Sequence, residues 1–171
     1  IKFSKYSPSY DEVYIEETNQ VREINTDELL IEILYFPINP ADILLLEGKY
    51  ASKPKLPSKL GAEAIARVKK VGTKIKTINI DDIVIPLTRD NWVEEKIVKA
   101  NEVIKINKKT DLLQASMLKI NPASAYLMLN NYIKIKKNDF IIQNAANSSI
   151  GNIINKLCNI YGIQCINIVR R

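Results

Sequence analysis

The chain contains no histidine, and this absence limits the chemistry that its side chains can perform. Histidine titrates nearest neutral pH and is the commonest protein ligand of transition metals. Without it, neither a Ser-His-Asp nor a Cys-His catalytic arrangement can form. The two cysteines, Cys158 and Cys165, lack the spacing of a zinc-ligand pair. We therefore expect no metal site, and any proton transfer must use Tyr, Lys, Asp, Glu or water.

The segment 144–151 has the small residues of a phosphate-binding turn. It follows an apolar run at 140–143 and precedes a predicted helix, so its backbone N–H groups can form a nest for an anion. Such turns usually carry three glycines, whereas here Ala145 and Ser148 take the first two places and only Gly151 remains. The alternative is a tight strand-to-helix turn in which Gly151 only allows close packing against the sheet.

Two arginines, Arg170 and Arg171, follow the next predicted strand, and no carboxylate stands there. NAD-specific sites place an acidic side chain at this point for the ribose 2′-hydroxyl, whereas a cation suits the 2′-phosphate of NADP. The planar guanidinium matches the geometry of a phosphate. The pair indicates NADPH as cofactor; the alternative is an exposed surface pair.

The elements before Asp111 are predicted to be β-strands. Short β-rich segments broken by Pro, Gly and Asp favour a sheet folded into a barrel-like domain. The predicted strands cover residues 29–35, 64–68, 83–85, 96–98 and 103–106.

After Asp111 the pattern changes to alternating helices and strands. Two helices at 112–118 and 123–129, with Asn121-Pro122 between them, precede the run at 140–143, which is typical of a strand buried on both faces. Ser148 and Ser149 can cap a helix over about 150–161, which Gly162 ends, and a second strand follows at 165–169. These elements form one β-α-β unit, the opening of a nucleotide-binding sheet. Because two parallel strands leave edges without partners, we expect further polypeptide or another chain to complete the sheet.

The composition indicates a soluble, intracellular globular protein. The hydrophobic fraction is 46%, no apolar run is long enough to cross a bilayer, and we expect no signal peptide. The net charge of +6 raises the question of nucleic-acid binding. The lysines are scattered in pairs such as Lys69-Lys70 and Lys136-Lys137 without interleaved aromatic residues, so we expect solvated surfaces and no nucleic-acid partner.

Several motifs in the first seventy-two residues occur in the order found in one protein family. They are Ile38-Asn39-Pro40-Ala41-Asp42, Glu47-Gly48-Lys49-Tyr50, Leu56-Pro57, Gly61-Ala62-Glu63 and Val71-Gly72. Together they resemble the catalytic, GroES-like domain of the medium-chain dehydrogenases/reductases. Zinc-dependent members carry a ligand Cys before the Asp at Asp42 and a ligand His beside the Glu at Glu63. Pro40 and Ala62 stand in those neighbourhoods here, so the chain resembles the zinc-free branch.

Three later stretches, 120–126, 142–148 and 166–171, resemble the trans-2-enoyl thioester reductases. The stretch 57–63 is at least as similar to the quinone oxidoreductase branch. The resemblance implies an α/β plus β fold: a GroES-like β-barrel domain over 1–118, then the opening of a Rossmann NADPH-binding domain over 119–171. It also implies NADPH-dependent reduction of the C2=C3 double bond of 2-enoyl thioesters in fatty-acid metabolism.

The resemblance further implies which residues form the site. Tyr50 would be the proton donor, Asn121 would lie near the nicotinamide or ribose, Asn147, Ser148, Ser149 and Ile150 would line the pyrophosphate turn, and Arg170 and Arg171 would meet the 2′-phosphate. Ser148 and Ser149 depart from the family pattern, because they add side chains where glycine lets phosphate approach. From composition alone, Tyr50 is a loop aromatic packed by Pro54 and Pro57, Glu63 is a structural carboxylate, and Trp92 is a core residue.

Other functions stay open at this point. A quinone or small-enone reductase shares the cofactor and the metal-free site, and a non-catalytic remnant is a third interpretation. For the enoyl reductase we expect a substrate carried on coenzyme A or an acyl carrier and a homodimer of the full-length protein. The mitochondrial matrix and a bacterial cytoplasm are both compatible with the sequence.

Overall fold

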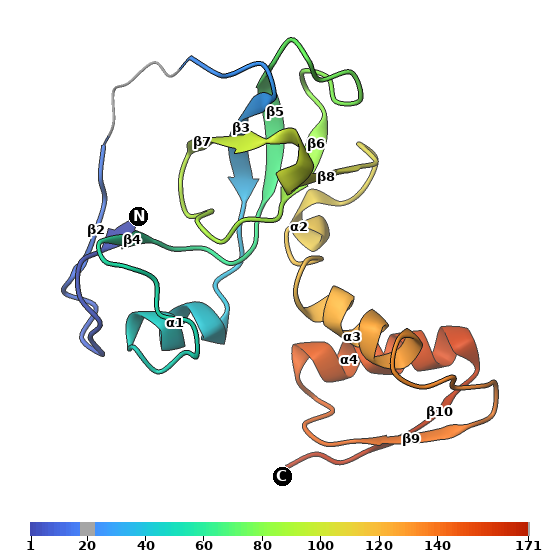
Figure 1. Cartoon of the computed structure of the whole chain (residues 1–171). Coiled ribbons are helices and arrows are strands. Elements are labelled where there is room, and N and C mark those ends of the chain that lie inside the picture. The colour runs from blue at the N-terminus through green and yellow to red at the C-terminus, as the bar shows by residue number, and fades with distance from the viewer. Residues whose placement is uncertain (18–22, 171) are drawn as a thin grey trace. The chain divides into compact units, whose positions relative to one another are not determined.

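The computed structural model describes residues 1–17 and 23–170. The chain forms two compact units, Ile1–Met117 and Leu118–Arg171, each of which is described by itself below (Figure 1). None of the described helices is long and apolar enough to cross a membrane.

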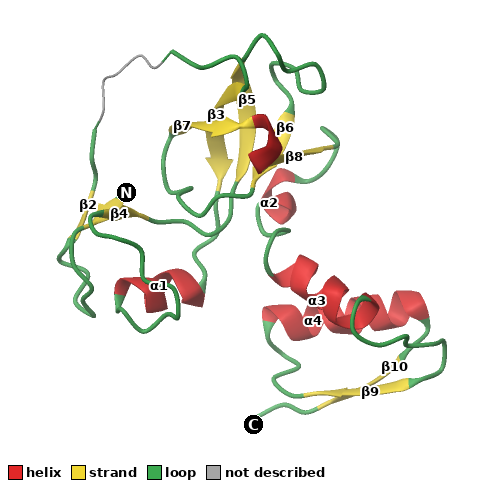
Figure 2. Cartoon of the chain, viewed as in Figure 1, coloured by secondary structure: helices red, strands yellow, loops and turns green. Residues whose placement is uncertain are grey.

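The first unit consists mainly of β-strands (Figure 2). Its elements are β1 (Lys2–Phe3), β2 (Val13–Tyr14), β3 (Glu28–Tyr35), α1 (Pro40–Leu46), β4 (Ser58–Lys59), β5 (Ile65–Val71), β6 (Ile83–Pro86), β7 (Glu95–Lys99), a 3-10 turn (Ala100–Glu102), β8 (Val103–Ile106) and α2 (Leu112–Ala115). Five strands form an antiparallel sheet in the order β7-β3-β5-β6-β8, and three short strands form a second sheet in the order β2-β1-β4. The strands predicted before Asp111 are therefore confirmed, whereas α1 and the three-stranded sheet were not foreseen.

The five-stranded sheet buries one set of alternating side chains. In β3, Leu29 and Ile31 are fully buried, as the two-residue period of a strand requires. They pack with Val68 of β5, Val84 of β6 and Val98 of β7 in one apolar cluster. Burial of this cluster holds the sheet together and fixes its register, since a slip of one residue would expose the whole set.

A second cluster lies beneath the loops that follow α1. Phe3, Leu46, Leu60 and Trp92 are buried together there. Trp92 is therefore a core residue, as predicted. The cluster connects the C-terminal end of α1 to β1 and to the connection between β6 and β7, and so it supports the segments that carry the candidate chemistry.

The second unit contains two helices and two strands. They are α3 (Asn121–Asn130), β9 (Phe140–Gln143), α4 (Ser149–Tyr161) and β10 (Gln164–Asn167). Strands β9 and β10 are parallel, with Phe140 opposite Gln164 and Gln143 opposite Asn167. Helices α3 and α4 lie on the same side of these strands (Figure 1), and their contact buries Ala125, Leu129, Ile154 and Cys158.

Three expectations for the residues after Asp111 differ from the structure. Within this chain, strand β9 is covered on one face only: Phe140 is 72% and Ile142 is 67% exposed, because α3 and α4 pack on one face of β9 and β10. Helix α2 ends at Ala115 rather than at residue 118. Pro122 does not separate two helices but lies in the first turn of α3, where the missing N–H of proline costs no hydrogen bond.

Candidate functional site

Tyr50 is attached to the C-terminal end of α1. The backbone N–H groups of Lys49 and Tyr50 both donate to the carbonyl of Leu44, at 2.9 and 3.1 Å. Gly48, with φ +71°, makes the turn, and a Cβ at this position would lie 3.0 Å from Cβ of Tyr6. The backbone at Tyr50 is therefore fixed to the helix, while its half-buried side chain extends from a turn.

The ring of Tyr50 faces a cation. The guanidinium carbon of Arg89 lies 5.5 Å from the centroid of the Tyr50 ring, within the range of a cation–π interaction. The carbonyl of Pro54 accepts a 2.6 Å hydrogen bond from the hydroxyl of Tyr6, and the packing of Tyr50 by Pro54 and Pro57 stays a prediction. Arg89 was not predicted as a site residue, because nothing in the neighbouring sequence marks it.

The segment that carries Arg89 is anchored by a buried lysine. Lys96 of β7 donates to the hydroxyl of Thr88 at 2.7 Å and to the side-chain oxygen of Asn91 at 3.3 Å, and it forms an ion pair with Asp90. Because Thr88 and Asp90 flank Arg89, these contacts fix the backbone on both sides of it. Lys96 is an exception to the expectation that the lysines are solvated. The sequence does contain a signal for this burial. Lys96 stands two residues before the apolar Val98, so the two side chains lie on the same, buried face of β7.

Burial shifts both groups of this ion pair. Burial lowers the pKa of the Lys96 ammonium, and the hydrogen bond and charge of Asp90 only partly offset this effect. For Asp90, burial raises the pKa, but the hydrogen bond and charge of Lys96 and a hydrogen bond from Thr88 outweigh it and hold the pKa below its usual value. Asp90 is thus a stable carboxylate and not a candidate general acid.

Backbone contacts continue this anchoring toward the core. The N–H of Asn91 donates to the carbonyl of Gly61 at 3.1 Å, and the N–H of Trp92 donates to the carbonyl of Leu60 at 2.9 Å. The side-chain amide of Asn91 also donates to Gly61, at 3.1 Å. The connection between β6 and β7 is therefore fastened to residues 60 and 61.

The buried carboxylates of this unit stabilise the fold. Asp42 accepts 3.0 Å hydrogen bonds from the backbone N–H groups of Asn39 and Ala62. Glu63 accepts one from the side-chain amide of Asn39, also at 3.0 Å. These hydrogen bonds join the start of α1 to the segment after β4. The contact of Glu63 accords with the structural role expected for it. Among the described residues, no group of three His, Cys, Asp or Glu side chains could hold a metal ion.

In the second unit, the segment 144–151 forms the turn between β9 and α4. Ser148 is the N-cap of α4, and its hydroxyl accepts a 3.2 Å hydrogen bond from the N–H of Gly151. Ala145, with φ +49°, adopts the left-handed conformation that favours glycine. At Gly151 a Cβ would lie 2.6 Å from the carbonyl oxygen of Ala146, so glycine is required by close approach to the turn itself.

The structure brings most of the predicted cofactor residues to this helix terminus. Ser148, Ser149 and Ile150 start α4, Asn147 precedes them, and the amide of Asn121 lies 3.5 Å from the hydroxyl of Ser149. Arg170 lies in the exposed segment after β10, whose Ile168 accepts a 3.3 Å hydrogen bond from the N–H of Ala146 in the turn. Arg171 lies outside the described residues.

The charges at this terminus suit a phosphate. The first turn of α4 holds no acidic residue, and residues 140–171 contain no Asp or Glu. A thirteen-residue helix presents partial positive charge and free N–H groups at its N-terminus. These residues therefore fit the diphosphate of a dinucleotide in charge, although the exposed Ser149 adds a side chain at the turn.

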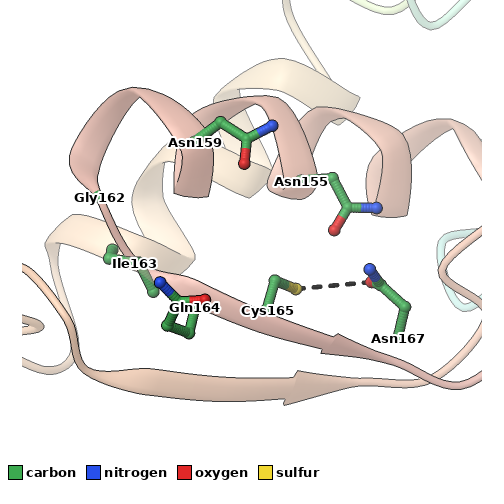
Figure 3. A pocket seen from close by; sticks show the side chains of 7 residues that line it. All are labelled: Asn155, Asn159, Gly162, Ile163, Gln164, Cys165 and Asn167. Carbon is green, nitrogen blue, oxygen red and sulfur yellow. Dashed lines mark hydrogen bonds between the residues drawn. The ribbon is translucent and has the colours of Figure 1, made fainter.

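A separate pocket of about 400 Å³ lies between α4 and β10 (Figure 3). It is lined mainly by polar side chains, namely Asn155, Asn159, Gln164, Cys165 and Asn167. None of the predicted cofactor residues lines it. Burial, with Cys165 as neighbour, raises the pKa of the nearby Cys158 thiol to about 11, so Cys158 is not a nucleophile at neutral pH.

Comparison with known proteins identifies the first unit. Residues 25–107 match the alcohol dehydrogenase GroES-like domain. The chain is similar to the mitochondrial enoyl-[acyl-carrier-protein] reductases of Dictyostelium discoideum, at 31% identity over 99% of this chain and 49% of the relative, and of Homo sapiens, at 31% over 88% and 41%. The chain belongs to the medium-chain dehydrogenase/reductase family.

Solved structures of this family extend the likeness to the second unit. A mitochondrial 2-enoyl thioester reductase heterodimer from Candida tropicalis matches 99% of this chain and 53% of its own, with a TM-score of 0.87 and 25% identity. A Bacillus thuringiensis protein assigned as an NADPH:quinone reductase matches 99% and 51%, with a TM-score of 0.89 and 28% identity. This medium-chain reductase chain thus spans about half the length of the relatives it matches, and its β9-α4-β10 unit is the opening of the Rossmann domain expected from the sequence.

Proposed function

We propose that this chain is the catalytic domain and the first part of the cofactor domain of an NADPH-dependent 2-enoyl thioester reductase. The observation that carries the proposal is similarity to enoyl-[acyl-carrier-protein] reductases over almost the whole chain, with Tyr50 held at the end of α1. The substrate would be a 2-enoyl thioester of fatty-acid metabolism, carried on coenzyme A or an acyl carrier protein.

In the proposed reaction, the bound NADPH would be the source of the hydride that adds to Cβ of the substrate. Negative charge then builds up on the thioester oxygen as an enolate, and Tyr50 gives its hydroxyl proton to Cα. The O–H bond of Tyr50 breaks, the Cα–H bond forms, and a proton from water restores the phenol. A phenol is a weak acid at neutral pH, but an enolate carbon is a strong base, so neither histidine nor a metal is required.

The cofactor would be held by the turn and the ends of the two strands. Asn147, Ser148, Ser149 and Ile150 would bind the diphosphate through the start of α4, and Asn121 would lie near the nicotinamide or ribose. Arg170, with Arg171, would meet the 2′-phosphate. Support comes from the absence of carboxylates over residues 140–171 and from the 3.5 Å contact between Asn121 and Ser149.

A quinone or enone reductase is the second candidate. The Bacillus thuringiensis protein assigned as an NADPH:quinone reductase favours it, since it is as similar in structure to this chain as the enoyl reductase is. The two candidates share the cofactor and differ in the electron acceptor, so a comparison of acceptors distinguishes them.

The test measures NADPH oxidation by the complete natural protein with 2-butenoyl-CoA and with a quinone in parallel. We expect oxidation with the thioester, little with NADH, and a loss of about 100-fold or more in turnover for Tyr50→Phe, with NADPH affinity unchanged. Tyr132→Phe, at an exposed tyrosine, is the matched control and should keep full activity. Full activity of Tyr50→Phe would remove Tyr50 from the mechanism. Oxidation with the quinone alone would establish the second candidate.

We also propose a homodimer located in the mitochondrial matrix. The mitochondrial relatives favour the matrix over a bacterial cytoplasm, and the Candida tropicalis relative is itself a dimer of two chains. Light scattering of the complete protein gives the mass of the assembly; a monomeric mass would contradict the dimer.

A further inference from the structure

The connection between β6 and β7 brings a charge to the proposed proton donor. The guanidinium of Arg89 lies over the ring of Tyr50, 5.5 Å from its centroid. Arg89 is exposed, and no described carboxylate lies within ion-pair distance of it. Among the described residues, its charge therefore faces the tyrosine ring without forming an ion pair.

We propose that Arg89 is a positioning residue for Tyr50. Its cation holds the plane of the ring, and it favours the negative charge that develops on the phenol oxygen while the proton moves to Cα. This inference rests on the proposed function and adds a second residue to the same site. Because the charge on Tyr50 exists only as the proton leaves, the interaction strengthens in the transition state and raises kcat rather than lowering KM.

The backbone around Arg89 is rigid enough for such a role. Lys96 holds Thr88 and Asp90 on either side, and Asn91 is bonded to Gly61 through both its backbone and its side chain. A group that orients another must itself be held by a second set of contacts. The contacts of Lys96 and Asn91 supply that set for the backbone that carries Arg89.

The alternative role for an exposed arginine at this position is to bind a phosphate of coenzyme A. Guanidinium groups match phosphate geometry, so this role uses the same side chain. The two roles predict different kinetics, however. A phosphate ligand acts on the binding of substrates that carry phosphates, whereas a positioning residue acts on turnover of every enoyl thioester.

The experiment uses the complete natural enzyme with two substrates, 2-butenoyl-CoA and the 2-butenoyl thioester of N-acetylcysteamine, which has no phosphate. We expect Arg89→Ala to lower kcat about tenfold on both substrates, with KM changed less than about twofold. The solvent deuterium isotope effect on kcat should increase, because proton transfer becomes slower. Arg89→Lys keeps the cation and should restore most of the activity. Lys53→Ala, at an exposed lysine near Tyr50 in the sequence, is the matched control and should behave as wild type.

The results that overturn the inference are distinct from those that overturn the proposed function. Unchanged kcat in Arg89→Ala, or a loss confined to KM for the coenzyme A substrate, would contradict a positioning role while leaving the reductase assignment intact. Equal losses of kcat in Arg89→Lys and Arg89→Ala would show that the positive charge is not required, and would also contradict the positioning role. A wild-type enzyme without activity on either thioester, or a fully active Tyr50→Phe, would instead refute the proposed function, and this inference with it.

Discussion

The Arg89 segment and the turn before α4 are both irregular, but different contacts hold them. Arg89 is fixed through Lys96, Asn91 and Gly61, and the hydrogen bond between Asn91 and Gly61 joins residues thirty positions apart. The turn is closed mainly by contacts within a few residues, such as the N–H of Gly151 on the hydroxyl of Ser148. The position of Arg89 therefore depends on packing within the first unit, whereas the turn before α4 is built largely from its own sequence.

The largest effect is expected when Lys96, the anchor of the Arg89 segment, is removed. Lys96→Ala leaves Asp90 and Asn91 without their shared partner, and we expect a loss of about 2–3 kcal/mol in the free energy of unfolding. This is less than for a fully buried pair, because 39% of the Asp90 side chain stays exposed. Urea unfolding followed by fluorescence of Trp92, the chain's single tryptophan, measures it in the first unit. Lys70→Ala, at an exposed lysine of β5, should change stability by less than about 0.5 kcal/mol; equal losses in both variants would show that burial of Lys96 is unimportant.

The second prediction concerns the locally built turn. In Gly151→Ala, the new Cβ would lie 2.6 Å from the carbonyl oxygen of Ala146, so the turn must shift. We expect a cost of about 1–3 kcal/mol, as for other overpacked sites. Hydrogen exchange of the amides of α4 should become faster, while the amides of β3 and β5 keep their protection.

Ser149→Ala is the matched control for this change, since Ser149 starts the same helix with an exposed side chain. It should leave exchange in α4 nearly unchanged. If exchange became faster throughout β3 and β5 in Gly151→Ala, the turn would not be the local structure described above.

The smallest expected effect is on the pH dependence of stability, through Asp82. Burial raises the pKa of Asp82, but hydrogen bonds from Lys105, from the backbone of Asn79 and from Lys108, together with the charge of Lys105, outweigh it and hold that pKa below its usual value. A carboxyl whose pKa is lower in the folded chain stabilises the fold above its unfolded pKa of about 3.9, and this stability is lost as the pH falls through the folded value.

Lys108→Met removes one of the cations that face Asp82, at 3.4 Å. We expect a loss of about 0.5 kcal/mol at neutral pH, which disappears once the pH falls below the folded pKa of Asp82. Unfolding curves between pH 7 and pH 2.5 measure the difference, and Lys109→Met, at the next exposed lysine, should show none. A loss that persisted unchanged in acid would mean that Lys108 acts through packing rather than through charge.

Much of the fold could be predicted because its signals are local. The strands before Asp111, helix α4 with its Ser148 cap, and the end of that helix at Gly162, which has φ +68°, all follow from short patterns in the sequence. Within this chain β9 is covered on one face and not on both as predicted, since an apolar run does not say which other elements cover the strand, and the chain spans about half the length of its relatives. Helix α1 is only seven residues long and was missed, because so short a segment shows little periodicity.

By itself, the sequence determined the kind of chemistry available: no histidine, a phosphate-type turn and arginines after the second strand. Turn and cap geometry depends on neighbouring residues, so their types and order suffice to specify it. Only the tertiary structure decided that Lys96 is buried beneath Thr88 and Asp90, and that Arg89 lies over Tyr50. These contacts join segments tens of residues apart, and the packing of the sheet, rather than any local pattern, brings them together.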